Sequence, residues 1–499
     1  MKNKFFISTA IPYVNSDPHI GFALELIQAD VLARYQRLLE KDVFFVTGTD
    51  ENALKNVQAA EKSGVDVRKF VDDHSGKFKK LSEVLNISNN DFIRTTEDRH
   101  VKGAQKLWKA CNSEDIYKKG YKGLYCVGCE EFKTQKDLIN GLCPEHKVKP
   151  EVVEEENYFF KLSKYQEKLL KLIESDELKI TPGSRKNEIL EFIRGGLEDF
   201  SISRSKERAK NWGISVPGDD SQIMYVWFDA LANYINALGY GDSDARFKEY
   251  WENGRVTHLV GKGITRFHAI YWPAMLLSAG LALPKEIIVH GYVTVDGEKI
   301  SKSIGNVVDP FSVIEKYGVD VVRYFLLREI PSGEDGDFSY KKLEERYNGD
   351  LANGLGNLIQ RTITLIDSNL SGELIYKHDL VKREVKEKTE EFFKNYTENI
   401  DNFLLHEALG RTWDLIGYAN KYIDDKKPWA AVKHDEAEFL VIMNNAVFIL
   451  YNIAWMLVPF LPETADKIFE ALGANRETKT LENHKFLVKK SAGLFPRLK

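Results

Sequence analysis

Several features are scarce in this 499-residue sequence, and each absence narrows the class of protein. Only four cysteines are present, too few for the disulfide framework of a secreted chain of this length. Residues Met1–Ala10 show no charged-then-apolar leader with a cleavage site, so we expect a cytoplasmic protein. The longest apolar run, Ala446–Leu461, is broken by Asn452 and Pro459 and falls short of the roughly 20 residues of a bilayer span. We therefore expect a buried helix there and no membrane contact.

A large excess of charge of one sign is also missing. The 70 basic and 75 acidic residues give a net charge of -5, which excludes a general nucleic-acid coating protein but permits a specific RNA partner held by a local patch. No internal repeat, low-complexity tract or long Gly/Ser linker is visible. At 43% hydrophobic residues, a chain of this length predicts a globular protein of two to four domains.

Two nucleotide-binding motifs are absent as well. Gly261-Lys262-Gly263 lies between a predicted strand and a predicted helix, but no third glycine follows at the dinucleotide-binding spacing. A Gly-Lys-Ser/Thr phosphate loop occurs nowhere in the chain. The sequence therefore argues against a nicotinamide enzyme and against a P-loop ATPase.

What is present begins with a strand–helix–strand pattern. Residues 4–9 are typical of a buried strand, and a loop from Pro12 to Pro18 leads into a helical repeat that runs from Ile20 to Leu38. A second apolar run, Val43–Val46, ends in Thr47-Gly48-Thr49-Asp50. Such a βαβ unit makes its two strands parallel and brings both following loops to their carboxyl ends, where an open α/β sheet binds its ligand.

The same pattern returns late in the chain. Thr257–Gly261 and Glu286–Val293 are predicted strands, Phe267–Ala279 a helix and Asp296–Asn306 a polar loop. We infer an α/β, Rossmann-like catalytic domain with a parallel sheet, whose halves span residues 1–115 and 216–295, interrupted by an insertion at 116–215. A loop region at 296–345 follows. After residue 345 strand signals disappear, and amphipathic segments at 346–499 predict an all-α helical bundle.

The strongest local motif is Lys299-Ile300-Ser301-Lys302-Ser303, which follows a predicted buried strand. The two lysines with Ser301 and Ser303 suit a mobile loop that closes over a triphosphate and neutralises the charge of departing pyrophosphate. The alternative is a solvated basic turn.

A second candidate motif opens the first predicted helix. In Pro18-His19-Ile20-Gly21, His19 can donate to phosphate, and Gly21 lets a ligand approach the free N–H groups of the helix start. A lone His-x-Gly is more often a packing feature, so the motif gains meaning only with a partner motif.

Three of the four cysteines cluster with a histidine in the predicted insertion. Cys126-x-x-Cys129 and Cys143-Pro-Glu-His146 form two pairs of ligands with the spacing of a tetrahedral zinc site, and we expect one structural Zn²⁺ held by Cys126, Cys129, Cys143 and His146. Reduced thiols without metal are the alternative. Cys111 lies outside the cluster and is predicted to be a small buried residue.

Together, His19-Ile20-Gly21 and Lys299–Ser303 resemble the paired His-Ile-Gly-His and Lys-Met-Ser-Lys-Ser signatures of class I aminoacyl-tRNA synthetases. Four further segments look like those of methionyl-tRNA synthetases, and the likeness covers nearly the whole chain: Ala10–Asn15, Gly48–Glu51, Tyr225–Ala230 and Phe267–Pro273. The resemblance implies activation of L-methionine with ATP and Mg²⁺ to methionyl adenylate, then transfer to the 3′ end of tRNA(Met), initiator tRNA included. It implies that His19, Lys299 and Lys302 carry catalysis.

The resemblance also assigns the binding residues. The methionine side chain would lie among Ile11, Tyr13, Trp227, Ala230, Tyr234 and His268, while Asp50 would hold the α-ammonium group. Aromatic edges suit a polarisable thioether, and a carboxylate suits an ammonium. Without the resemblance, these aromatic residues would be ordinary core and Asp50 a helix cap. In the helical region, Asn357, Arg361 and Trp429 match anticodon-reading positions, although burial of Trp429 in the bundle is the alternative.

Three positions depart from the family pattern. Phe22 stands in place of the second signature histidine, Asn52 in place of another frequent histidine, and Gly263 in place of a common aspartate near the nucleotide ribose. These changes put ATP geometry in doubt, and they motivate the rival hypothesis of a non-catalytic RNA-binding protein with the synthetase fold.

Sister synthetases fit the sequence less well. Isoleucyl, valyl and leucyl enzymes carry a large editing domain between the two signatures, for which this chain has little room. A cysteinyl enzyme would place zinc in its amino-acid pocket. The sequence lacks the appended C-terminal domain through which some relatives dimerise, so we expect a monomer.

Overall fold

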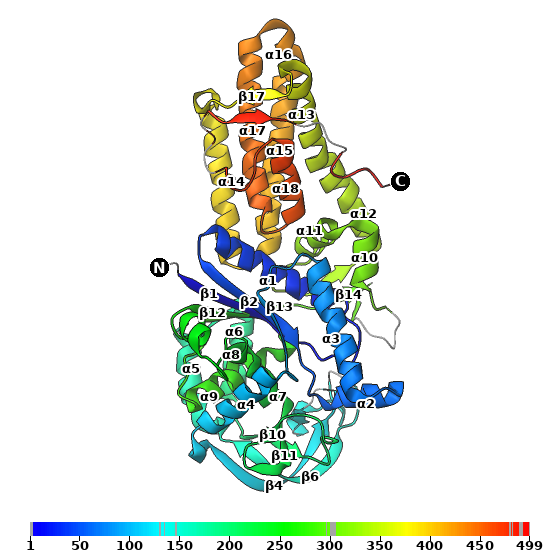
Figure 1. Cartoon of the computed structure of the whole chain (residues 1–499), viewed down its shortest axis with the longest axis vertical. Coiled ribbons are helices and arrows are strands. Elements are labelled where there is room, and N and C mark those ends of the chain that lie inside the picture. The colour runs from blue at the N-terminus through cyan, green and yellow to red at the C-terminus, as the bar shows by residue number, and fades with distance from the viewer. Residues whose placement is uncertain are drawn as a thin grey trace. The chain divides into compact units, whose positions relative to one another are not determined.

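A parallel six-stranded sheet organises the N-terminal part of the chain in the computed structural model (Figure 1). The structure describes residues 3–128, 131–133, 135–144, 147–295, 297–299, 306–478, 481, 483–488 and 493–498. The chain forms two units, Met1–His290 and Gly291–Lys499.

The sheet of the first unit has the strand order β3-β2-β1-β12-β13-β7, with every pairing parallel. Its central strands are buried along almost their whole length because helices cover both faces, which explains their near-continuous apolar runs. In sheet order the strands are β3 (Asp91–Arg94), β2 (Asp42–Thr49), β1 (Lys4–Thr9), β12 (Arg255–Gly261), β13 (Glu286–His290) and β7 (Lys179–Thr181).

Helix α1 (Ile20–Leu38) packs on β1, β2 and β12 and covers one face of the sheet with α3 (Val67–Val84). Helices α4 (Asp98–Ala110), α8 (Asn233–Asn236) and α9 (Trp272–Ser278) lie on the opposite face (Figure 1), where they contribute to one large apolar core. The remaining α-helices described in this unit are α2 (Leu54–Ser63), α5 (Gln166–Glu174), α6 (Gly183–Arg194) and α7 (Val226–Leu231). Short 3-10 or π-helical segments are η1 (Ser113–Asp115), η2 (Gln135–Asp137), η3 (Leu162–Tyr165), η4 (Phe247–Glu252), η5 (Lys262–Ile264) and η6 (Phe267–Tyr271).

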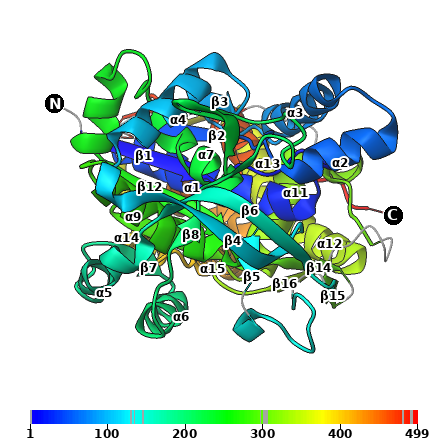
Figure 2. The ribbon, with the colours of Figure 1, turned by 90° about the horizontal axis from the view of Figure 1, so that it is seen from below.

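The predicted insertion forms a long antiparallel ribbon of β4 and β6, which Figure 2 shows from below, but it also returns to the main sheet. Its strands β5 (Glu131–Lys133), β4 (Ile116–Cys126), β6 (Glu151–Phe160) and β8 (Phe200–Ser201) form one sheet. Strand β9 (Ser203–Ser205) joins β10 (Ser215–Val216), at the end of the insertion, and β11 (Asp219–Met224), beyond it, in another sheet of order β10-β11-β9. Strand β7 pairs instead with β13, with Ile180 opposite Ile287. The sheet thus takes an edge strand from the insertion.

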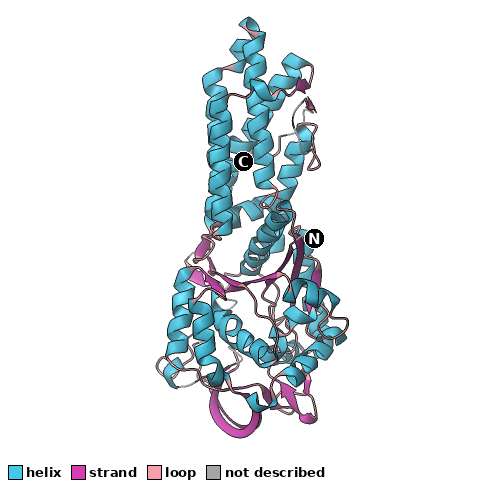
Figure 3. Cartoon of the chain, turned by 90° about the vertical axis from the view of Figure 1, so that its left-hand side faces the viewer, coloured by secondary structure: helices cyan, strands magenta, loops and turns pink. Residues whose placement is uncertain are grey.

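The second unit is mainly helical, as the colouring of Figure 3 makes clear. A small sheet of β15 (Glu298–Lys299), β14 (Val293–Val295) and β16 (Gly336–Phe338) precedes the helices. The helices are α10 (Pro310–Tyr317), α11 (Val319–Glu329), α12 (Tyr340–Arg346), η7 (Tyr347–Gly356), α13 (Asn357–Leu370), η8 (His378–Leu380), α14 (Arg383–Asp401), α15 (Leu405–Lys426), α16 (Pro428–His434), α17 (Glu436–Leu457) and α18 (Pro462–Ala471).

Helix α17 is the central helix of this bundle, in contact with α14, α15, α16 and α18. Within the described ranges it alone is long and apolar enough to cross a membrane, yet most of its apolar stretch is buried against its neighbours. Its bounds, Glu436–Leu457, confirm the predicted buried helix but shift it toward the N-terminus. Pro462 at the start of α18 marks where the next helix begins.

The α/β class, the Rossmann-like sheet and the C-terminal helical bundle are confirmed. One expectation was wrong: strands do occur after residue 345, since β17 (Glu373–Ile375) pairs with β18 (Lys485–Leu487). The predicted strand Glu286–Val293 is also interrupted, because β13 ends at His290 and β14 begins at Val293.

Candidate active site

The strand order of the first unit reverses between β1 and β12, and the segments that follow these two strands carry Ile11, Tyr13 and His268 of the predicted methionine site. Ile11 and Tyr13 follow β1, and Asp50 follows β2. A parallel bridge joins Tyr13 to Asp50, and the Asp50 N–H donates to the carbonyl of Pro12 at 2.9 Å. The β1 and β2 loops are therefore held together at the carboxyl edge of the sheet.

An aromatic wall stands beside these loops. Trp227 on α7 stacks on Phe267, with ring centroids 3.7 Å apart and planes 3° apart. Its ring meets the edges of Tyr13 and His268 at 6.5 and 6.3 Å. Ala230 lies on the same short helix and is buried. The structure thus gathers Tyr13, Trp227 and His268, predicted from separate segments, into one cluster.

Tyr234 and His268 form a directional hydrogen-bond chain. His268 Nδ1 lies 3.0 Å from the carbonyl oxygen of Ile264, which can only accept, so Nδ1 carries the ring proton. Nε2 therefore accepts from the Tyr234 hydroxyl at 2.7 Å. Burial lowers the pKa of His268 to about 4 and raises the pKa of Tyr234 above its ordinary value. Both side chains are uncharged at neutral pH, which suits an apolar guest.

Asp50 is buried at the edge of this cluster, with 2% of its surface exposed. Its Oδ1 accepts from the backbone N–H of Asn52 at 3.2 Å, and its carbonyl accepts from Asn56 at 3.0 Å. The N-cap residue of the next helix, α2, is Ala53. Capping of that helix therefore does not explain the aspartate.

His19 is the N-cap residue of α1. Its Nδ1 accepts from the Gly21 N–H at 3.1 Å, and burial lowers the pKa of His19 below its ordinary value. In the neutral ring that results, the proton sits on Nε2, which is left as a donor near the positive end of the helix.

The three departures from the family pattern have distinct surroundings. Phe22 packs edge-on against Phe78 of α3, with ring centroids 5.1 Å apart, so the apolar replacement serves the helix contact. Gly263 lies in η5, directly after β12. Asn52 donates to Thr95 O at 3.2 Å and to Asp229 Oδ2 at 2.7 Å.

Of the Lys299–Ser303 motif, only Lys299 is described, and only in its backbone. It ends β15, opposite Thr294 of β14 in the second unit. Ser301, Lys302 and Ser303 lie outside the described residues.

The predicted zinc ligands are described in part. Cys126 ends β4 with 1% of its surface exposed, and Cys143 is fully buried in a turn closed by the Lys147 N–H. Cys129 and His146 lie outside the described residues, and among those that are described no three His, Cys, Asp or Glu side chains gather as a metal site. Two buried thiols, one at the end of β4 and one between β5 and β6, nonetheless fit the donor set of a structural zinc. Cys111 is buried, as predicted, and burial raises the pKa of its thiol to about 12.

The predicted anticodon residues lie on neighbouring helices of the second unit. The Arg361 guanidinium stands 5.6 Å from the ring centroid of Trp429 and is tethered to Asp424 at 2.6 Å. Asn357 is exposed one turn earlier on α13 and lines a hollow of about 360 Å³. Trp429 is 45% exposed, which rules out burial in the bundle.

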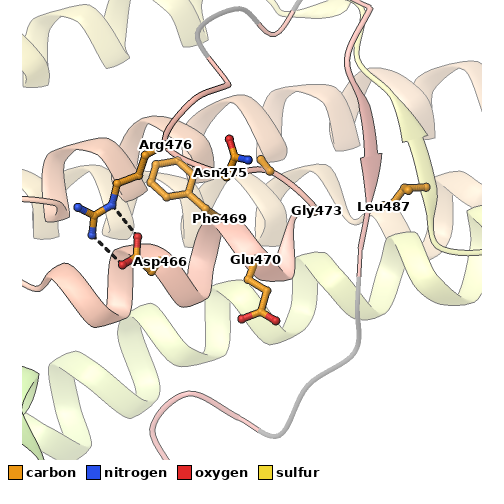
Figure 4. Close-up of a pocket in the computed structure, with 8 residues that line it drawn as sticks. Asp466, Phe469, Glu470, Gly473, Asn475, Arg476 and Leu487 are labelled. Carbon is orange, nitrogen blue, oxygen red and sulfur yellow. Dashed lines mark hydrogen bonds and ion pairs between the residues drawn. The ribbon is translucent and has the colours of Figure 1, made fainter.

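Another hollow of this unit holds none of the predicted residues. About 560 Å³ in volume, it lies beside α18, where Arg476 pairs with Asp466 at 2.6 and 2.8 Å (Figure 4). Because both charges are already paired and exposed, this hollow offers no obvious chemistry.

Two contributors were missed in the sequence. Phe267 lies beside His268 in a segment that was singled out, but its stacking on Trp227 was not foreseen. The Lys55 ammonium stands 3.8 Å from the Tyr13 ring centroid and donates to the Gly128 carbonyl at 3.1 Å. It therefore lies between the loop after β1 and the segment that follows Cys126. No motif marks it.

Comparison with known proteins agrees with this geometry. The family model described as tRNA synthetases class I (M) matches residues 5–149 and 135–363, and the anticodon binding domain of methionyl tRNA ligase matches residues 377–494. The sheet, its site and these matches define a class I aminoacyl-tRNA synthetase.

Individual relatives are more specific. Methionine–tRNA ligase of Brucella melitensis is 43% identical, over 95% of this chain and 92% of its own length. That of Thermotoga maritima is 44% identical, over 93% of this chain and 75% of its own length. The solved structure of Mycobacterium tuberculosis methionyl-tRNA synthetase in complex with methionyl-adenylate aligns over 100% of both chains at 38% identity, with a TM-score of 0.94. The apo form of that enzyme aligns with a TM-score of 0.87 at 35% identity, over 100% of this chain and 99% of its own. The chain belongs to the methionyl-tRNA synthetase family.

Proposed function

We propose that the first unit binds methionine and ATP at the carboxyl edge of its sheet, forms methionyl adenylate, and passes the methionyl group to the 3′ end of tRNA(Met), including initiator tRNA. The observation that carries this proposal is the convergence of Tyr13, Trp227, Tyr234 and His268 beside buried Asp50. It supplies an uncharged aromatic enclosure next to one carboxylate, which is the complement of an amino acid with an apolar side chain.

In this assignment the thioether of methionine contacts Trp227 and Tyr13, with Ile11 and Ala230 completing the enclosure. Sulfur makes favourable contacts with aromatic rings. The Asp50 carboxylate receives the α-ammonium group in a charge-assisted hydrogen bond. Because the Tyr234 hydroxyl donates its only hydrogen to His268, its oxygen can act toward a ligand only as an acceptor.

The methionine carboxylate attacks the α-phosphate of ATP in line, and pyrophosphate leaves. Catalysis is by positioning and charge stabilisation, without a covalent enzyme intermediate. His19 donates from Nε2 to phosphate oxygens and Gly21 admits them to the helix start. We assign Lys299, Ser301, Lys302 and Ser303 to the triphosphate. Mg²⁺ would arrive with ATP and offset phosphate charge.

Zinc is proposed as a structural ion held by Cys126, Cys129, Cys143 and His146. It would fix the tip of the β4–β6 ribbon, where Ile139, Leu142 and Val148 are exposed and bury little apolar surface. We further propose that the enzyme is a monomer and acts in the cytoplasm.

For tRNA selection we assign Trp429 to stacking on an anticodon base, with Asn357 and Arg361 contacting base edges. An exposed indole held by a guanidinium is typical of a surface that binds single-stranded RNA.

The test is methionine-dependent exchange between ATP and labelled pyrophosphate by the purified protein, with the other amino acids tried singly. Exchange with methionine alone is expected, and it would show that Phe22 and Gly263 are tolerated. Exchange with a different amino acid would move the assignment to a sister enzyme. Folded, zinc-loaded protein that binds tRNA without any exchange would establish the RNA-binding alternative instead.

A further inference from the structure

We propose that Asn52 is a positioning residue that fixes Asp50 and the Trp227 helix relative to each other through a buried hydrogen-bond network. The proposal rests on the proposed function, because it takes Asp50 and Trp227 as the two sides of the methionine site. Asn52 itself occupies a position where the family often has histidine.

The amide of Asn52 joins three segments. Its side-chain Nδ2 donates to the Thr95 carbonyl at 3.2 Å and to Asp229 Oδ2 at 2.7 Å, and its backbone N–H donates to Asp50 Oδ1 at 3.2 Å. Asp229 lies two residues after Trp227 on α7. One side chain therefore connects the loop after β2 to the helix that presents the indole.

Behind Asp229 the network continues through His100 of α4. His100 Nε2 lies 2.5 Å from Asp229 Oδ1, and Asn236 Nδ2 lies 3.3 Å from His100 Nδ1. Since the amide nitrogen can only donate, Nδ1 accepts and Nε2–H donates to the carboxyl group. Asp229 thus receives one hydrogen bond on each oxygen, from His100 and from Asn52.

All three groups behind Asn52 are fully or almost fully buried: Asp229 and His100 expose 0% and Asn236 1% of their surfaces. A buried carboxyl group is costly unless both oxygens are satisfied, so the position of Asp229 determines where Asn52 must stand. Asn52 by contrast is half-buried, at the end of the network nearest the site.

The far end of the network depends on a glycine. A Cβ added at Gly103 of α4 would lie 1.9 Å from Asn236 Oδ1, so no other residue leaves room for this amide. Gly103→Ala therefore displaces Asn236 and, through it, His100, from a position that is not itself part of the methionine site, although Asn236 shares α8 with Tyr234.

The experiment measures KM for methionine and for ATP in pyrophosphate exchange, methionine affinity by calorimetry, and the melting temperature. Asn52→Leu keeps the size and the backbone N–H bond to Asp50, and removes the two side-chain hydrogen bonds to Thr95 and Asp229. A bond to a charged group is worth about 1.5–3 kcal/mol, so we expect a rise of roughly tenfold or more in the KM for methionine, with the KM for ATP changed less than about twofold. Gly103→Ala should act in the same direction but less.

A reversed pair separates positioning from general stability. Asn52→Asp places two carboxyl groups in contact and should impair methionine binding. The double variant Asn52→Asp with Asp229→Asn restores a donor–acceptor pair at the net charge of the wild-type protein. It should recover part of the lost methionine binding. As a matched control, Asn445→Leu removes a buried amide of α17 that bonds to Leu380 and Val441 carbonyls in the second unit. It should lower the melting temperature only.

Three outcomes would overturn the inference: an Asn52→Leu protein that loses stability with unchanged methionine KM, an equal rise in both KM values, or no recovery in the double variant. Failure of the wild-type protein to exchange would instead count against the proposed function, and the calorimetric comparison would still test the network.

Discussion

The stacking of Phe267 on Trp227 should determine how well the enzyme binds methionine. The Trp227 side chain has 9% of its surface exposed, and its Nε1 is buried with no hydrogen-bond partner among the described residues. Ring contacts therefore set its orientation, and the face-to-face contact with Phe267 at 3.7 Å is the shortest of those described. Phe267→Leu removes the flat surface while keeping an apolar side chain.

An aromatic pair contributes about 0.5–1.5 kcal/mol beyond area burial, which corresponds to a rise of about 2–12-fold in the KM for methionine. The assay is pyrophosphate exchange at saturating ATP, with Phe267→Tyr as the variant that keeps the ring and should keep the KM. Phe325→Leu, which removes a buried ring that contacts Phe338 in the second unit, controls for lost stability. An unchanged KM in folded Phe267→Leu protein, or an equal loss in Phe267→Tyr, would refute the reasoning.

Four further predictions follow from the site. The pKa of His268 is about 4 in the folded protein and 6.5 ordinarily, so the unfolded chain takes up the proton at a higher pH than the folded chain. This side chain alone should therefore lower the free energy of unfolding by about 3 kcal/mol as the pH falls from 6.5 to 4. Urea unfolding of His268→Gln should show a shallower pH dependence. Lys302→Ala should slow adenylate formation roughly 100-fold or more with little change in methionine binding, and an unchanged burst of adenylate would remove its assigned role. Cys126→Ser should give substoichiometric zinc by metal analysis and a lower melting temperature, whereas full zinc content with unchanged stability would exclude the site. Trp429→Ala should raise the KM for tRNA by roughly 5–150-fold while exchange without tRNA stays at the wild-type rate; an unchanged KM for tRNA would mean that the indole stacks on no base.

The sequence was most informative where the signal is local. The first strand and helix were predicted within a residue or two because consecutive buried residues and a helical repeat are properties of the segment itself. Strands β7, β17 and β18 were not predicted, since each has three residues and is a strand only through a partner distant in sequence. Short segments of this kind carry no periodicity.

A similar distinction applies to the site. That the loops after β1, β2 and β12 would meet followed from the rule for parallel strands, so Tyr13, Asp50 and His19 were placed at one edge from sequence. The bond from Asn52 to Asp229 joins residues 177 positions apart. Its existence depends on how α7 is oriented against the sheet, which no local pattern encodes.

Strand β7 limits how the chain can be shortened. Because β7 pairs with β13, deletion of residues 116–215 would remove the outer strand of the sheet and expose the backbone N–H and C=O groups of β13. An exposed strand edge of this kind favours edge-to-edge aggregation. The β4–β6 ribbon, whose register runs unbroken from Ile116 opposite Phe160 to Tyr125 opposite Glu151, can in contrast be trimmed from its tip in matched pairs. A minimal catalytic unit should therefore be built by shortening this ribbon and leaving its base intact.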